Sequence, residues 1–219
     1  MSRRRWVGAA AIAFGILMFV GIVISGSTPD RDASDAAQKY AEYWQDGAHQ
    51  DNASRGALLL MYAFALQVCL AAGLRHLLRQ TGDDGPLPTL VAAAGSASAA
   101  LFAAGGMLIN GVGLAGAEGG YTPDGDAAML TESIGYYTVT AAMLLAGVMV
   151  LATSISNRRA RVLPQWTIAL SVLVGIAGAG TIFTAWLGFM LLPLWAVVVG
   201  IVLLVVRPAG EDGTSSGLA

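Results

Sequence analysis

Three side chains near the start of the sequence have the types and spacing of metal ligands. Glu42, Asp46 and His49 follow one another at intervals of four and three residues, so a helix would place them on one face. Two carboxylates and an imidazole are adequate ligands for a divalent cation. Because the sequence offers no evident fourth ligand, the solvated face of a surface helix explains the same residues. We therefore expect neither a bound metal nor any other cofactor.

Polar side chains inside long apolar stretches form a second candidate group. They are Gln67, Asn110, Thr181 and Thr184. A polar group in a membrane is costly unless it is paired, so these residues either hydrogen-bond between helices or line a path for a small solute. Both interpretations stay open. The predicted midplane positions carry none of the charged residues on which proton-coupled pumps and ion exchangers usually depend.

A third group lies where another apolar stretch begins. Glu132, Tyr136 and Tyr137 are close together in the sequence. An acidic residue near a helix N-terminus is stabilised by the helix dipole, and tyrosines are typical of the membrane interface. An interfacial role therefore accounts for them, and an external vestibule for a ligand is the alternative.

Motifs for catalysis are missing from the sequence. There is no paired-histidine zinc motif, phosphate-binding glycine loop or nucleophile elbow. The single cysteine, Cys69, excludes an intrachain disulfide, and its apolar neighbours predict a buried side chain. We expect no catalytic residue, and favour a protein that is not an enzyme.

The elements that must position these residues follow from composition. Of 219 residues, 56% are hydrophobic and 12% are charged, whereas a soluble domain carries about 25% charged residues. The mean hydropathy is +0.65. These values exclude a disordered chain, a nucleic-acid-binding protein with a basic face and an ordinary cytosolic enzyme. They indicate an integral membrane protein, with the lipid bilayer as its first partner and no nucleic acid.

A membrane-crossing helix needs about 20 apolar residues, and this rule predicts six transmembrane helices in an all-α bundle. We expect them at residues 6–25, 56–78, 87–113, 133–156, 163–186 and 189–206. The uncharged stretch from Val162 to Val206 is too long for one crossing, so we expect a turn at Gly188 and Pro193 in the first turn of the last helix. The third helix is richest in small residues, which allow close packing, and we expect it at the centre of the bundle or at a dimer contact.

The positive charges predict the orientation. With the N-terminus inside, the 12 Lys and Arg residues divide nine to three in favour of the cytoplasmic segments, as the positive-inside rule requires. Both termini are then cytoplasmic. The first apolar run is longer than the core of a secretory signal, so we expect it to be a retained helix.

Residues 1–209 are expected to form one membrane domain, with 27–55 as an external segment and 210–219 as a disordered tail. Within the external segment, apolar residues recur at three- and four-residue spacing from Ala33 to Trp44. That spacing predicts a short amphipathic helix on the outer membrane surface, between the first two transmembrane helices.

The run Thr28-Pro29-Asp30, the end of the second helix at Leu74–Arg79 and the later Val162–Trp166 resemble uncharacterised multi-pass membrane proteins of actinobacteria. The resemblance implies a six-helix protein of the bacterial inner membrane and transfers no activity. We expect a non-enzymatic accessory, interaction or sensor protein, with a homo-oligomer or another membrane protein as further partner. The alternatives are a small-solute transporter or channel, and a membrane enzyme with an external acid and histidine site.

Overall fold

A computed structural model describes residues 3–120, 124–181 and 186–206, and in these ranges the chain is all α-helical. The helices are α1 (Arg3–Ser25), α2 (Ala36–Gln45), α3 (Gly47–Gln80), α4 (Leu87–Gly119), α5 (Gly125–Ala160), α6 (Trp166–Ala179) and α8 (Trp186–Val205). Five of them, α1, α3, α4, α5 and α8, are long and apolar enough to cross a membrane. The predicted tail at 210–219 lies outside the described residues.

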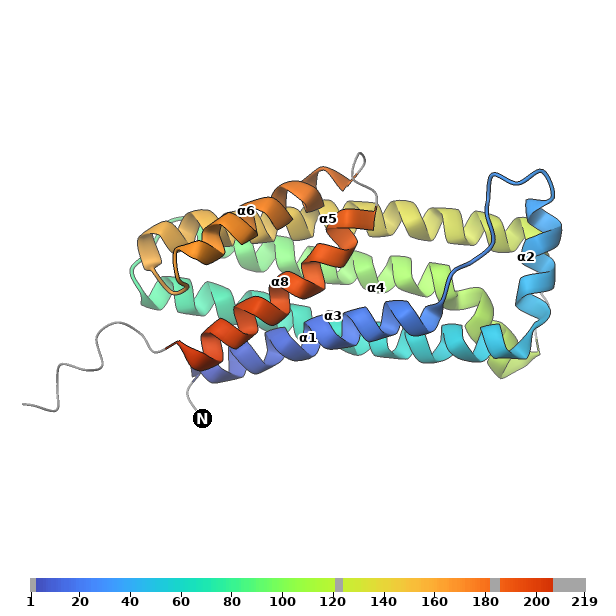
Figure 1. Ribbon diagram of the computed structural model, residues 1–219, viewed down its shortest axis with the longest axis horizontal. Coiled ribbons are helices and arrows are strands. Elements are labelled where there is room, and N and C mark those ends of the chain that lie inside the picture. The colour runs from blue at the N-terminus through green and yellow to red at the C-terminus, as the bar shows by residue number, and fades with distance from the viewer. Residues whose placement is uncertain (1–2, 121–123, 182–185, 207–219) are drawn as a thin grey trace, which may run out of the picture.

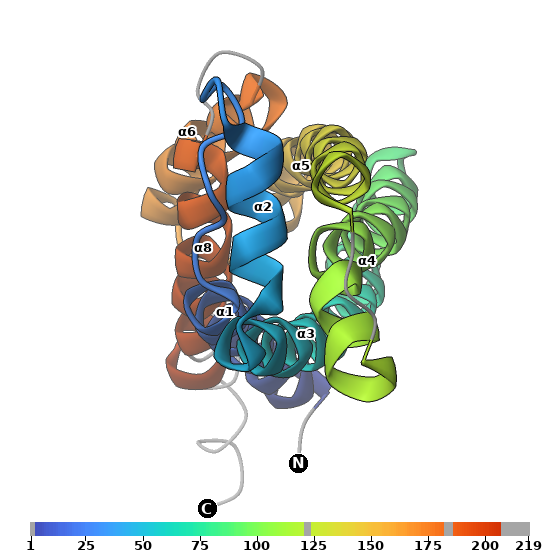
Figure 2. The same cartoon turned by 90° about the vertical axis from the view of Figure 1, so that its right-hand side faces the viewer.

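The long helices and α6 form a closed ring. Going round it, α1 packs against α3, α3 against α4, α4 against α5, α5 against α6, α6 against α8, and α8 against α1. Figure 2 views this ring along its length, with α2 crossing one end. The expectation that the third apolar helix occupies the centre was wrong, because α4 is one member of the ring.

Glycines allow the ring helices to approach closely. A Cβ atom on Gly105 of α4 would lie 2.9 Å from the carbonyl oxygen of Gly135 on α5, and one on Gly147 would lie 2.7 Å from that of Gly175 on α6. Contacts this short leave no room for a side chain. The small residues therefore serve packing between neighbours in the ring.

Large apolar side chains cover the outside of the ring. Among the exposed ones are Val23, Leu58, Leu130, Leu173 and Ile176. A monomer in water rarely exposes so much apolar surface. The surface fits a multi-pass membrane protein, with lipid in contact with the outward faces.

Several helices are longer than their apolar cores. α3 begins at Gly47, not residue 56, and α5 begins at Gly125, not residue 133. At this end α2 supplies Tyr40 and Trp44 to a second small core with Ala53 and Ala128. The extra turns are therefore covered by protein and do not need the membrane.

The predicted turn at Gly188 was wrong. α6 ends at Ala179 and α8 begins at Trp186, so Gly188 lies within α8, where its Cβ position is 3.0 Å from the Ala177 carbonyl oxygen. Pro193 is inside α8 and not in its first turn, and its carbonyl oxygen faces Gly15 of α1. The expected position of Pro193 was wrong because it depended on the turn at Gly188.

The expectation that Cys69 is buried was also wrong. Its side chain is exposed on the outward face of α3, near Trp6 of α1. An apolar stretch in a membrane helix faces lipid as well as protein, so its hydropathy does not distinguish the two sides.

Candidate ligand pocket

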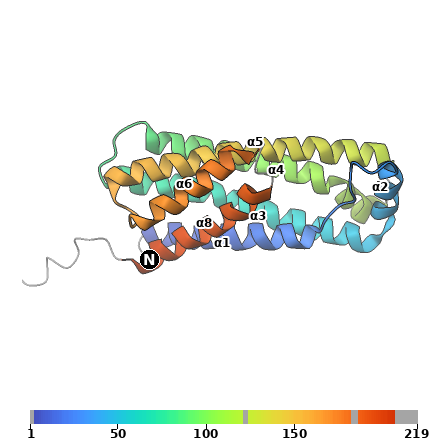
Figure 3. The same cartoon turned by 45° about the horizontal axis from the view of Figure 1, so that its top comes forward.

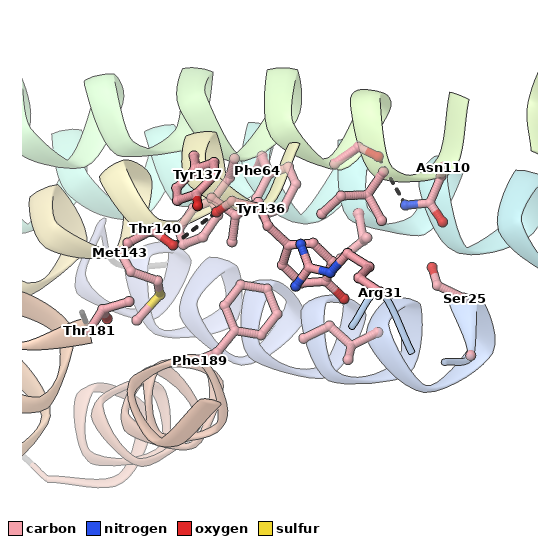
Figure 4. A pocket seen from close by; sticks show the side chains of 17 residues that line it. Ser25, Arg31, Phe64, Asn110, Tyr136, Tyr137, Thr140, Met143, Thr181 and Phe189 are labelled. Carbon is pink, nitrogen blue, oxygen red and sulfur yellow. Dashed lines mark hydrogen bonds between the residues drawn. The ribbon is translucent and has the colours of Figure 1, made fainter. Parts of the chain in front are cut away.

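A pocket of about 600 Å³ lies inside the ring, in the half nearer α2, because the end of α1 and the linker that leads to α2 line it. Its walls come from α1, α3, α4, α5, α8 and the linker between α1 and α2. Figure 4 shows the lining side chains, with Ser25 and Asn110 toward one end and Met143 and Thr181 toward the other. The lining residues are Ile22, Ser25, Gly26, Arg31, Leu60, Phe64, Phe102, Gly106, Ile109, Asn110, Tyr136, Tyr137, Val139, Thr140, Met143, Thr181 and Phe189.

Three phenylalanines form an aromatic wall. The rings of Phe64 and Phe102 stack with centroids 5.2 Å apart, and Phe189 meets Phe102 edge-on at 5.8 Å. They come from α3, α4 and α8, so the wall depends on the ring being closed. Such a surface suits an apolar group of a ligand.

Polar groups gather at the other end of the pocket. The guanidinium carbon of Arg31 lies 4.3 Å from the centre of the Tyr136 ring, a cation–π contact. The Ser25 hydroxyl is buried and has no hydrogen-bond partner in the described part of the chain. Asn110 donates from Nδ2 to the Gly106 carbonyl oxygen at 2.9 Å, which leaves its amide oxygen for other partners.

A buried acid stands one helical turn beyond the pocket. Glu132 is 2% exposed and accepts a hydrogen bond from the Thr28 hydroxyl at 2.6 Å. Its second oxygen, Oε2, and the hydroxyl of Tyr40 on α2 are buried without hydrogen-bond partners among the described residues. Burial raises the pKa of Tyr40 well above its usual range, and the charge of Glu132 adds to this shift. The Thr28–Glu132 bond ties the α1–α2 linker to α5, and the Tyr40 ring packs α2 against Ala128 of α5.

Of the three residues predicted to form a vestibule, two line the pocket and one does not. Tyr136 and Tyr137 line the pocket, and the Tyr137 side chain is 78% exposed. Glu132 lies outside the lining, packed under α2.

Of the polar residues predicted inside the membrane helices, some line the pocket and Gln67 does not. Gln67 is fully buried and donates to the Ser98 hydroxyl at 3.0 Å, and Ser98 donates to the Ala142 carbonyl oxygen at 2.8 Å. This chain of bonds links α3, α4 and α5 away from the pocket. Asn110 and Thr181 line the pocket instead, and Thr184 lies outside the described residues.

The predicted metal ligands do not share a helix. The chain breaks at Asp46, whose carboxylate caps α3 by accepting from the Ala48 N–H at 2.8 Å. Glu42 accepts from Gln38, and the His49 ring stacks on Tyr43 with centroids 3.9 Å apart. In the described ranges no three His, Cys, Asp or Glu residues are placed to hold a metal ion. The prediction that Glu42, Asp46 and His49 lie on one face of a single helix was wrong.

Sequence reasoning missed Ser25, Arg31 and the phenylalanine wall. Arg31 is one of the three cations outside the segments predicted to be cytoplasmic, and this isolation is the only signal that could have drawn attention to it. The phenylalanines are ordinary core residues by type, and only the ring brings them together. Comparison of the chain with known protein families, curated proteins and solved structures finds no match.

Proposed function

We propose that this chain is a protein of the bacterial plasma membrane that crosses the bilayer six times, with both termini in the cytoplasm. α6 and α8 act as the fifth and sixth crossings, and α2 lies on the outer face. Arginines gather at the end of the ring opposite α2, as the positive-inside rule expects for a cytoplasmic face. They include Arg3 at the start of α1, Arg75 and Arg79 near the end of α3, and Arg158 and Arg159 near the end of α5.

Within that topology we propose a non-enzymatic binding function, as a sensor or accessory protein that takes up a small amphipathic molecule from the outer side. The pocket carries this proposal. Its volume lies within the range of small-molecule sites, about 300–1,000 Å³. It combines an aromatic wall with a few polar groups, which is the usual chemistry of such sites.

The lining chemistry favours binding over catalysis. Among the described residues that line the pocket there is one cation, and there are hydroxyl and amide groups, but no carboxylate or imidazole. General acid or base catalysis in the physiological pH range usually relies on one of these groups. An external acid and histidine site loses support as well, because Glu42 on α2 does not join Asp46 and His49, whose side chains lie 3.7 Å apart.

Dense packing below the pocket favours binding over transport. A Cβ atom on Gly95 of α4 would lie 2.5 Å from Ala71 on α3 and 2.6 Å from the sulfur of Met149 on α5. The bonds from Gln67 through Ser98 to Ala142 cross the same level. A solute path to the cytoplasm would have to separate these three helices.

The test is a variant that fills the pocket. The Cβ position of Gly106 is 3.7 Å from Phe64 and faces the pocket, so Gly106→Leu adds a side chain there without a backbone clash. Gly111→Leu, on the same helix with open space around it, is the matched control. We expect native mass spectrometry to detect a bound small molecule on the wild-type and Gly111→Leu proteins and not on Gly106→Leu. Equal occupancy of all three would contradict a function centred on this pocket.

A further inference from the structure

The pocket has a chemical polarity that specifies its ligand more closely, and this inference rests on the proposed binding function. One end holds Met143 with the hydroxyls of Thr140 and Thr181, and the wall of Phe64, Phe102 and Phe189 supplies the apolar surface. The other end carries Arg31 as its only charged group among the described lining residues. A molecule that matches both ends has an apolar tail and an anionic head.

Arg31 has its donors available for such a head. One face of its guanidinium lies over the Tyr136 ring. In the described part of the chain, no carboxylate lies within ion-pairing distance of it. Glu132 is near enough to act on it electrostatically but does not pair with it. The planar guanidinium remains positive at all physiological pH values and binds a carboxylate with two parallel hydrogen bonds. The Ser25 hydroxyl is packed against Gly56 of α3, so Arg31 is the group at this end that faces an anionic head.

The size of the pocket limits the tail. At about 30 Å³ for a water-sized group, 600 Å³ accommodates about 20 such groups. That is enough for one long acyl chain with its head.

The shape of the ring provides a route from the membrane. Figures 1 and 3 both show α8 beginning near the middle of the bundle, so that α6 and α8 do not extend along the half nearer α2. On that half the pocket is lined by Ile22 of α1 and by the exposed Tyr137 of α5. A molecule lying in the outer leaflet can enter there sideways, with its head at the level of Arg31.

We propose that the pocket binds a single-chain anionic amphiphile of the long-chain carboxylate class, with the carboxylate on Arg31 and the chain along the phenylalanine wall. The test uses the full-length protein in nanodiscs of neutral phosphatidylcholine. Palmitate and hexadecanol, which have the same chain but different heads, are titrated and binding is measured by calorimetry. We expect palmitate to bind the wild-type protein at least ten-fold more tightly than hexadecanol.

Variants separate the head from the tail. Arg31→Gln is expected to bring palmitate binding to within about two-fold of hexadecanol, while Arg31→Lys keeps part of the preference because it keeps the charge. Gly106→Leu is expected to abolish binding of both compounds, and Gly111→Leu to change neither. A palmitate preference that survives in Arg31→Gln overturns the assignment of the head.

The remaining outcomes distinguish this inference from the function on which it rests. If hexadecanol binds as tightly as palmitate and Gly106→Leu abolishes both, the anionic head is wrong but the pocket function stands. If neither compound binds any variant and native mass spectrometry finds no bound molecule, both fail. Displacement of palmitate by phosphatidylglycerol at equal concentration overturns the single-chain assignment in favour of a two-chain lipid.

Discussion

At the scale of single residues, two buried acids hold the ends of the bundle. Near α2, Glu132 accepts from Thr28 and fixes the linker after α1. At the opposite end, Asp83 in the connection between α3 and α4 accepts from the Ser156 hydroxyl and from the Gly85 N–H at 3.1 Å. Each acid joins an irregular segment to α5, so both are expected to matter for stability.

The Asp83 contacts predict a pH dependence. The hydrogen bond from Ser156 is the main cause of the lowered pKa of Asp83. Because the folded pKa is below the unfolded one, the stabilisation is fully present above about pH 4, the usual aspartate pKa, and is lost as the pH falls through the folded value. Asp83→Asn is expected to lower the free energy of unfolding by about 1 kcal/mol at pH 7 and to flatten its decline below about pH 4. Thermal unfolding in detergent across this range measures both, and an unchanged acid decline contradicts the assignment.

The Thr28–Glu132 bond predicts a coupled pair. Thr28→Val removes the donor and leaves a buried carboxylate oxygen without a partner, at an expected cost of about 1.5–3 kcal/mol. In the background of Glu132→Gln the same change should cost less, since the pair is already altered. A double-mutant cycle of unfolding free energies measures this coupling. Thr131→Val is the control, because that exposed hydroxyl bonds only within its own helix, and additive costs for Thr28 and Glu132 would refute the coupling.

At the scale of elements, close helix contacts determine the ring. Gly105 and Gly135 bring α4 and α5 together, while Gly8 and Gly200 do so for α1 and α8. A side chain at any of these positions meets backbone atoms of the partner helix, which cannot move aside without separating the pair.

Gly105→Val is therefore expected to destabilise the protein by about 1–3 kcal/mol or more. Gly111→Val, on the same helix with nothing near its Cβ position, should change stability little. Melting temperatures of the two variants in the same detergent make the comparison. Similar losses for both would mean that the substitution acts through helix propensity and not through the contact with α5.

The sequence was sufficient to predict the apolar cores of the five long helices but not where the helices end. Hydropathy marks the residues that need lipid, whereas Gly47 begins a helix because Asp46 caps it and α2 covers its first turns. The same limit explains Gly188 and Pro193, whose places depend on contacts with Ala177 and Gly15.

The pocket was less accessible to prediction than the fold. Asn110, Tyr136 and Tyr137 were identified by type, because polar and interfacial residues are uncommon in apolar segments. The phenylalanine wall is assembled from three helices that only the closed ring brings together, and nothing local in the sequence marks it.

At the scale of the whole molecule, the ring is asymmetric along its length. The half nearer α2 holds the pocket, and the other half is filled by side chains such as Leu70, Leu74 and Met149, all fully buried. Together with the proposed orientation, this asymmetry makes the pocket accessible from outside and closed to the cytoplasm.

The orientation itself predicts a labelling pattern. In a Cys69→Ser background, a cysteine at Asp32, in the α1–α2 linker, is expected to react in intact cells with a maleimide that cannot cross the membrane. A cysteine at Asp84, in the α3–α4 connection, should react only after the cells are opened. Both positions are exposed, so burial does not confuse the result, and the reverse pattern would invert the topology.

The most direct test of the account is the accessibility of Asn110 and Gln67 in intact cells, because one lines the pocket and the other lies in the packed half. Single cysteines at these positions, in the Cys69→Ser background, are exposed to a small charged methanethiosulfonate reagent added outside. The account predicts that the cysteine at position 110 reacts and that the one at position 67 does not. Reaction at both positions would reveal a path through the membrane, and reaction at neither would mean that no pocket opens to the outside.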